Sequence, residues 1–419
     1  MDNNTLYNWL YIPPNVYVRE IEDKGFFLYD TQTGVFLITS DTELCAVVKD
    51  VYEPKNLGVI KYEQKSLISN DFTKAVEKGL VKIIPIKDEK IKPVNFLPIL
   101  NLQNDFSKYD NPDEAPHLRK NVTRFLSALN IYLSYSNNLY DAEEKSFTEN
   151  ASKQVLLASS GNPEQYIELK VLENIFLQAA HSSTKKINFI PGNNYFQKVK
   201  QNDFFQLLSG FDFEYHIHLS VNDFVILQQN SKFKKLEVFY NLYIDKFTTE
   251  EKIKQIPSLC FGDKCLIHCL ITSEKEYIFY KNNKILYESF NNINYIPILT
   301  SENHEFFEKN VFLTTDDLSA NPVSMHEIFR NRKLNANFFG ILSVLPDKSV
   351  FAHGGDVKLG NITNTSLTEL VYNELKRNSS WRKTRDLTPC KNCFFCYLCP
   401  PVSIYETVSN NYKICKNEI

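Results

Sequence analysis

Lys186-Ile-Asn-Phe-Ile-Pro191 has the length and apolar content of a β-strand, and a second such run follows at Glu214-Tyr-His-Ile-His-Leu-Ser-Val221. The chain between the two runs is long enough for a helix. A strand, a helix and a second strand form the unit that builds parallel sheets, because parallel neighbours need a long crossover connection. The pair therefore predicts an α/β fold.

The same pattern continues on both sides of this pair. Further strands are expected at Asn130–Tyr135, Gln154–Ser159, Leu236–Ile244 and Lys264–Leu270, and a crossover helix is expected at Pro163–Ala180. Six parallel strands joined by right-handed crossovers can curl into an open barrel. We therefore predict a partial (β/α)6 barrel within residues 91–334.

Two other regions flank the expected barrel. Residues 1–90 begin with three alternating runs, which are Val16–Glu22, Gly25–Asp30 and Val35–Thr39. Helices follow, one capped by Asp41 and one over Ser69–Lys78, and this order predicts a winged-helix-like domain. Residues 335–419 begin with a hairpin at Ile341–Ala352, continue with a helix at Ser366–Lys376 and end in a cysteine cluster.

Composition narrows the class of protein. The 419 residues suffice for two or three domains, and 43% hydrophobic residues suffice for folded cores. A net charge of −3 gives no general attraction to nucleic acid or to an anionic membrane. The sequence has no signal peptide and no apolar run of membrane-spanning length, so we expect a cytoplasmic protein. In that compartment we do not expect the nine cysteines to form structural disulfides.

The cysteines gather at one end of the chain. Five of them are Cys390, Cys393, Cys396, Cys399 and Cys415. A two-residue gap lets two thiolates of one turn reach the same metal ion, and Cys399 with Cys415 can supply a second pair. Four thiolates suit tetrahedral zinc or an iron–sulfur cluster. The spacing therefore predicts a metal centre.

This segment resembles the late part of the SPASM domain, the C-terminal extension of many peptide-modifying radical SAM enzymes. That family has Cys-x2-Cys-x5-Cys-x3-Cys and a later cysteine, which serve two auxiliary iron–sulfur clusters. Here the order is Cys390, Cys393, Cys399, Ser403 and Cys415. The resemblance implies that the first cluster is lost, because serine replaces one ligand and the chain lacks the upstream cysteines.

The same resemblance implies one retained [4Fe–4S] cluster, with zinc as the alternative. Its ligands would be Cys390, Cys393, Cys399 and Cys415, and Cys396 lies outside the family pattern.

The catalytic cluster motif of radical SAM enzymes is missing. Its Cys-x3-Cys-x2-Cys follows the first barrel strand, where this chain has Ser136-Asn-Asn-Leu-Tyr-Asp141. The spacing Cys-x3-Cys occurs at Cys265 and Cys269, but Thr272 occupies the third position and the pair falls in an expected strand. We therefore expect no SAM binding and no catalytic residues. His216 and His218 are interpreted as core or barrel-lumen histidines.

The N-terminal order of strands and helices resembles the precursor-recognition element of ribosomal peptide pathways. The matching landmarks are Phe27-Leu-Tyr-Asp30, Val35–Thr39 and Ala75-Val-Glu-Lys-Gly-Leu80. With Trp9-Leu-Tyr-Ile12 and Leu398–Glu406, the chain resembles pseudo-radical-SAM proteins encoded beside true maturases of double-glycine-type precursors. The resemblance implies a non-catalytic partner of a radical SAM peptide maturase, which binds the maturase, the precursor peptide or both.

Two other functions fit the residues. One is an enzyme that uses its remaining iron–sulfur cluster for electron transfer or for a peptide modification without SAM. The other is a winged-helix regulator that binds nucleic acid. Acidic residues are interspersed among the lysines of residues 1–90, and this pattern disfavours a nucleic-acid partner.

Overall fold

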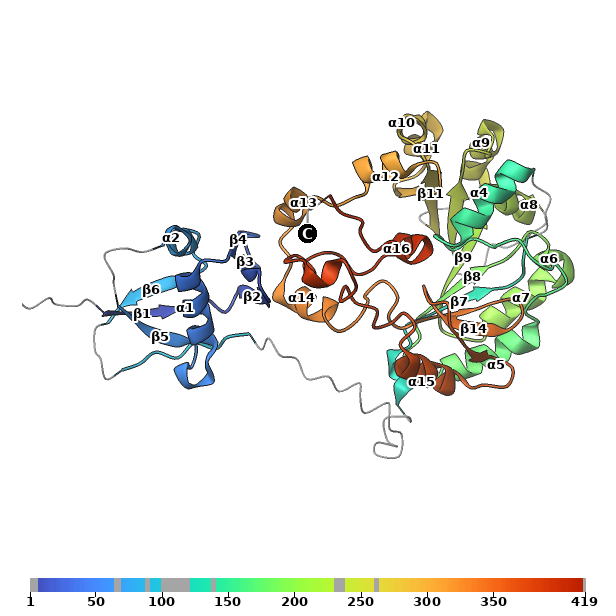
Figure 1. The fold of residues 1–419 in the computed structure, drawn as a ribbon. Helices are drawn as coiled ribbons and strands as arrows, with labels where there is room; N and C mark the ends of the chain where they lie inside the picture. Colours follow the sequence, from blue (N-terminus) through green and yellow to red (C-terminus); the bar gives the residue numbers. More distant parts are fainter. Residues whose placement is uncertain are drawn as a thin grey trace, which may run out of the picture.

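The computed structural model describes residues 7–63, 69–86, 91–98, 121–136, 141–229, 238–259 and 264–416. Within these residues the strands form three sheets, two small and one large. Figure 1 shows the small sheets at one end of the molecule and the large sheet at the other. The C-terminal segment lies between them.

The first small sheet has the order β5-β1-β6 and is antiparallel. Its strands are β1 (Tyr7–Tyr11), β5 (Val59–Glu63) and β6 (Lys82–Pro85). Helices α1 (Thr42–Tyr52) and α2 (Asn70–Glu77) accompany it, with η1 (Pro54–Asn56) between them in sequence. Asp41 caps α1 by accepting from the Leu44 N–H, as expected, and Ser69 caps α2 in the same way.

The second small sheet is an antiparallel meander of β2 (Val16–Ile21), β3 (Gly25–Asp30) and β4 (Phe36–Thr39). These strands confirm the three runs read from the sequence. Gly25 has a positive φ of 103°, and a Cβ there would lie 2.1 Å from the Thr39 carbonyl oxygen. Glycine is therefore required where the chain enters β3.

The large sheet has the order β12-β11-β10-β9-β8-β7-β13-β14-β15 among the described residues. The strands from β12 to β13 are parallel, and β14 and β15 are antiparallel additions. Their bounds are β7 Ala128–Tyr132, β8 Lys186–Ile190, β9 Glu214–Ser220, β10 Val238–Ile244, β11 Cys265–Ile271, β12 Ile293–Pro297, β13 Ile341–Val344, β14 Ser349–Ala352 and β15 Lys358–Asn361. This arrangement confirms the α/β class.

One expected strand is wrong. Gln154–Ser159 is a loop after α4 (Ala142–Ser152), and β7 pairs directly with β8 in the sheet. The Gln154 amide bonds both backbone groups of Leu299, at 2.8 Å each. Val155 and Leu157 pack beside Leu270 without joining a strand. The apolar run therefore reflects packing under the sheet edge.

Helices follow most strands of the large sheet (Figure 1). Beside α4 and a short η3 (Val122–Phe125), they are α5 (Leu169–Ala179), α6 (Tyr195–Lys198), α7 (Gln201–Leu208), α8 (Val221–Gln229), α9 (Glu250–Leu259), α10 (Glu274–Lys281) and α11 (Lys284–Ser289). Helix α5 begins later than the expected Pro163, because residues 161–168 form turns and an isolated bridge.

The last part of the chain adds α12 (His304–Asn310), α13 (Thr315–Ala320), α14 (Met325–Asn331), α15 (Leu367–Arg377), η5 (Cys390–Asn392) and α16 (Ile404–Ser409). Helix α15 and the β13–β14 hairpin confirm two further expectations. Because β13 pairs with β7, this region extends the large sheet. The principal hydrophobic core lies between that sheet and its helices.

Candidate metal centre

The five C-terminal cysteines surround one small cavity of about 20 Å³. Its lining residues are Leu313, Arg385, Cys390, Cys393, Cys396, Cys399, Tyr412, Ile414 and Cys415. The four cysteines proposed as ligands therefore come together, and Cys396 joins them. Metal ligation by these thiols stays a prediction.

Tight turns place the first four thiols on the cavity. The Cys393 N–H donates to the Cys390 carbonyl at 3.0 Å, and the Cys396 N–H donates to the Cys393 carbonyl at 3.2 Å. The first two gaps are thus one turn each, and the Cys399 N–H then donates to the Phe395 carbonyl at 3.0 Å. Cys415 arrives from another direction, through an isolated parallel bridge to Leu313.

A buried ion pair supports this segment. Arg385 and Glu406 are 6% and 0% exposed, and their atoms meet at 2.7 Å and 3.1 Å. Arg385 also donates to the Pro400 carbonyl at 2.5 Å, and its Nη1 lies 3.9 Å from the Cys390 sulfur. Glu406 accepts from Ser403 at the start of α16. Ser403, at the position of the missing family ligand, therefore caps a helix and does not line the cavity.

Burial favours the protonated form of four of the five thiols. Burial raises the pKa of Cys399 to about 12 and that of Cys396 to about 11. Burial also raises the pKa of Cys390 and Cys393, and the positive charge of Arg385 opposes this rise at Cys390. A bound cation would displace these protons to solvent, because metal ligands are thiolates.

The donor set suits a soft metal in kind. Sulfur is the donor atom that zinc and iron–sulfur clusters share, and no carboxylate of the described residues lines the cavity. Within the same part of the chain, however, no group of three or more potential ligands already stands close enough to hold a metal. Two thiols donate to carbonyl oxygens instead, Cys390 to Tyr412 at 3.4 Å and Cys396 to Arg385 at 3.3 Å.

The size of the cavity bears on which metal could enter. About 20 Å³ is the room of roughly one water molecule. A single ion fits this space once the thiols rotate from their carbonyl partners.

The other cysteine pair does not form a second centre. Cys269 is buried in β11, where burial raises its pKa to about 12. Cys265 is disulfide-bonded, which corrects our expectation that the chain would contain no structural disulfide. The pair thus lacks the features of a SAM-cluster motif, in line with its placement in a strand. Of the loop where the family has that motif, residues 137–140 lie outside the described residues.

A polar row crosses one face of the large sheet and was missed in the sequence. Asn294 donates to His268 Nδ1 at 3.5 Å, and His268 Nε2 faces Asn241 Oδ1 at 3.1 Å. Asn241 then donates to His216 Nδ1 at 3.1 Å, and His216 Nε2 faces Glu214 at 2.5 Å. Because each amide donates to Nδ1, both imidazoles carry their proton on Nε2.

A second row runs toward the other edge of the sheet. Tyr243 donates to His218 Nδ1 at 3.0 Å, and His218 Nε2 faces Asn188 Oδ1 at 3.2 Å. Asn188 donates to Asn130 at 2.7 Å, and Asn130 donates to His353 Nδ1 at 3.3 Å. Each donor therefore points the same way along the row. This places His216 and His218 on the sheet face, as interpreted from their spacing.

The histidines of both rows are held neutral. Burial lowers the pKa of His268 and of His353 to about 4, and it lowers the pKa of His218 well below its usual value. Protonation would place a second donor opposite each amide N–H. The rows therefore depend on neutral imidazole.

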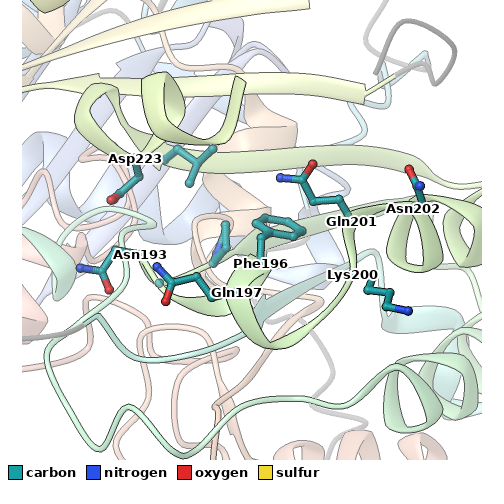
Figure 2. A pocket seen from close by; sticks show the side chains of 10 residues that line it. Asn193, Phe196, Gln197, Lys200, Gln201, Asn202 and Asp223 are labelled. Carbon is teal, nitrogen blue, oxygen red and sulfur yellow. The ribbon is translucent and has the colours of Figure 1, made fainter. Parts of the chain in front are cut away.

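Two larger cavities open near the carboxyl ends of the parallel strands. One, of about 950 Å³, lies among Ser134, His353 and Thr407, and Tyr412 lines both this cavity and the cysteine cavity. The other, of about 410 Å³, lies beyond β8 and β9. Figure 2 shows Asn193 and Gln197 across this second cavity from Asp223.

Comparison with known proteins gives little. No family model and no curated protein matches the chain. A solved structure of a histidine-tagged protein, described as "anSMEcpe with bound AdoMet", is similar over 65% of this chain and 87% of that one, at 15% identity and a TM-score of 0.41. A TM-score this low carries no argument about fold or function. In the described parts of the chain, no helix has the length and apolar content needed to cross a membrane.

Proposed function

We propose that this chain is a non-catalytic partner of a radical SAM peptide maturase and that it helps to present a ribosomally made precursor peptide. One contrast carries the proposal. Five thiols meet at one cavity near the C-terminus, whereas the segment after the first parallel strand, residues 133–141, contains no cysteine. Thiols are present where a metal centre would support structure. They are missing where the cluster that cleaves SAM would be bound.

The precursor would bind at the open edge of β4. Within the described residues β4 pairs with β3 alone, so its other edge can accept an added strand. Helix α2 flanks this edge: Lys78 Nζ donates to the Phe36 carbonyl at 2.9 Å, and Thr39 donates to Asp71 at 2.9 Å. Ile38 is 40% exposed there and offers an apolar contact.

Edge blocking tests this binding. A lysine on an edge strand discourages strand addition, so Ile38→Lys should weaken binding of the labelled precursor at least tenfold in fluorescence anisotropy. The control is Ile84→Lys on β6, where the isoleucine is 41% exposed. Equal precursor binding by both variants would rule out the β4 edge as the binding site. A chain that retains neither precursor nor maturase in co-purification would remove the whole proposal.

The metal centre would be structural, with Cys390, Cys393, Cys399 and Cys415 as ligands. The family resemblance implies [4Fe–4S], and four thiolates also suit a single zinc ion. Anaerobic purification followed by iron, sulfide and zinc analysis separates the two. A redox-active cluster would instead favour the second candidate, an iron–sulfur electron-transfer protein or a peptide-modifying enzyme that works without SAM.

A further inference from the structure

The cavity of about 950 Å³ lies between the large sheet and the C-terminal segment. Tyr132 and Ser134 line it at the carboxyl end of β7, His353 follows β14, and Thr407 belongs to α16. Figure 1 shows α16 beside that end of the sheet. The volume is within the range of small-molecule sites, and open α/β sheets bind their ligands at the carboxyl ends of the strands. The cavity therefore has the size and the place of a ligand site.

The polar row that ends at His353 fixes this imidazole in one tautomer. The Asn130 side chain donates to His353 Nδ1 at 3.3 Å, and Asn130 Oδ1 already accepts from Asn188 at 2.7 Å. Nε2 of His353 therefore carries the ring proton. Phe338 packs edge-on against the ring, with centroids 5.6 Å apart, and Ser380 donates to the His353 carbonyl at 2.7 Å. Within the described residues, no protein group accepts from this Nε2–H.

Two other donors on the cavity also lack an acceptor. In the described part of the chain, the Tyr132 hydroxyl has no hydrogen-bond partner and the Lys383 ammonium has no carboxylate partner. Burial raises the pKa of Tyr132 to about 12, so its hydroxyl keeps the proton at neutral pH. Lys383 Nζ lies 4.9 Å from the centre of the Tyr412 ring, which also lines the cavity. A ligand that supplies acceptors would complete all three donors.

The acidic residues on the cavity do not complete these donors. Glu149 accepts from Ser160 at 2.7 Å, and Asp356 is exposed. Lys153 and Lys383 balance the two carboxylates in number, so the lining has no net charge. The donors without acceptors therefore decide the chemistry of the ligand.

We propose that this cavity binds a ligand by its oxyanion group, a carboxylate or a phosphate, through the Nε2–H of His353, the Tyr132 hydroxyl and the Lys383 ammonium. Hydrogen bonds to a charged acceptor are stronger than those between neutral groups, and a donor that is already fixed loses little freedom on binding. Asn130 is a positioning residue, because its hydrogen bond leaves the ring proton on Nε2. The site depends neither on the β4 edge nor on the metal centre.

Three probes with the same body and different head groups test the site on the full chain. Benzoate and phenyl phosphate carry the two oxyanions, and benzamide is the neutral control. Dissociation constants from ligand-observed NMR should show at least one anion bound about tenfold more tightly than benzamide, because charge-assisted hydrogen bonds are roughly twice as strong as neutral ones. The more tightly bound anion identifies the head group of the ligand.

Variants locate the binding in the cavity. His353→Phe keeps a planar ring without a donor, and Lys383→Met keeps the length of the side chain without its charge. Each should weaken binding of the preferred anion about tenfold. The control is Lys281→Met, which removes a lysine that also lies over a tyrosine ring, 5.4 Å from the centre of Tyr277, but does not line the cavity. This control should bind the anion like wild type.

The NMR spectrum of wild type gives a readout that needs no variant. In protein with isotope-labelled histidine nitrogens, His353 should carry its proton on Nε2, and the preferred anion should shift the Nε2 signal more than the Nδ1 signal. Absence of binding by both anions at millimolar concentration, or equal affinity for benzamide, would overturn the proposal. So would anion binding that His353→Phe and Lys383→Met leave unchanged, or a ring proton on His353 Nδ1.

Discussion

Glu406 accepts two buried hydrogen bonds from Arg385, of 2.7 Å and 3.1 Å. This pair joins the chain just before Cys390 to α16. Removal of one partner leaves the other charge buried and uncompensated. We therefore expect Glu406→Gln to lower the free energy of unfolding by about 3–5 kcal/mol in urea titrations. The loss should appear with and without metal, because the pair does not need a ligand.

A surface pair provides the control for this variant. Glu274 lies 3.0 Å from Lys309, and both side chains are more than half exposed, at 57% and 65%. Glu274→Gln makes the same chemical change and should alter the free energy of unfolding by less than about 1 kcal/mol. Similar losses in the two variants would show that burial does not decide the strength of the Arg385 contact.

The sequence predicted the strands that belong to the repeating order of strand and helix. β8 is largely apolar and β9 alternates polar and apolar residues, each is followed by a helix, and both strands were predicted. Gln154–Ser159 failed because a short apolar run under a sheet edge looks the same as a buried strand. The two cases differ in a contact with a residue that is distant in sequence. Here that contact is the pair of hydrogen bonds between the Gln154 amide and the Leu299 backbone.

In the candidate site too, features set by local spacing were predicted, whereas features set by distant contacts were not. Convergence of Cys390 and Cys393 could be predicted because two-residue spacing has a local geometric consequence. The hydrogen bond from Arg19 to the Lys391 carbonyl could not, since 372 residues separate the two and a lone arginine in a strand has no signature. The asparagine and histidine rows were also missed, because their pattern appears only when the register of neighbouring strands is known.

The histidine rows predict a loss of stability in acid. Burial lowers the pKa of His268 to about 4 from an ordinary 6.5, so between these values the unfolded chain binds the proton and the folded chain does not. Stability should therefore fall as pH falls from about 6.5 to 4, by on the order of 3 kcal/mol for this residue. Denaturant unfolding across that range measures the loss.

A variant isolates this effect from an opposing one. Burial raises the pKa of Asp223 to about 6, which favours the folded chain as pH falls through the same range. His268→Gln keeps a polar partner for Asn241 but cannot titrate. The pH dependence should therefore be weaker on the acid side in His268→Gln than in wild type. Identical curves for the two proteins would mean that the pKa of His268 is the same in the folded and the unfolded chain.

Metal content provides the most direct check on the cysteine cavity. Cys399 lines it, whereas Cys269 is buried in β11 and does not. Cys399→Ser should lose most of the bound metal, because a hydroxyl is a poor replacement for a thiolate on a soft ion. Cys269→Ser is a matched change at a buried cysteine and should keep the wild-type metal-to-chain ratio. Equal ratios in the two variants would place the metal elsewhere, whereas loss in Cys399→Ser alone would tie it to the C-terminal thiols.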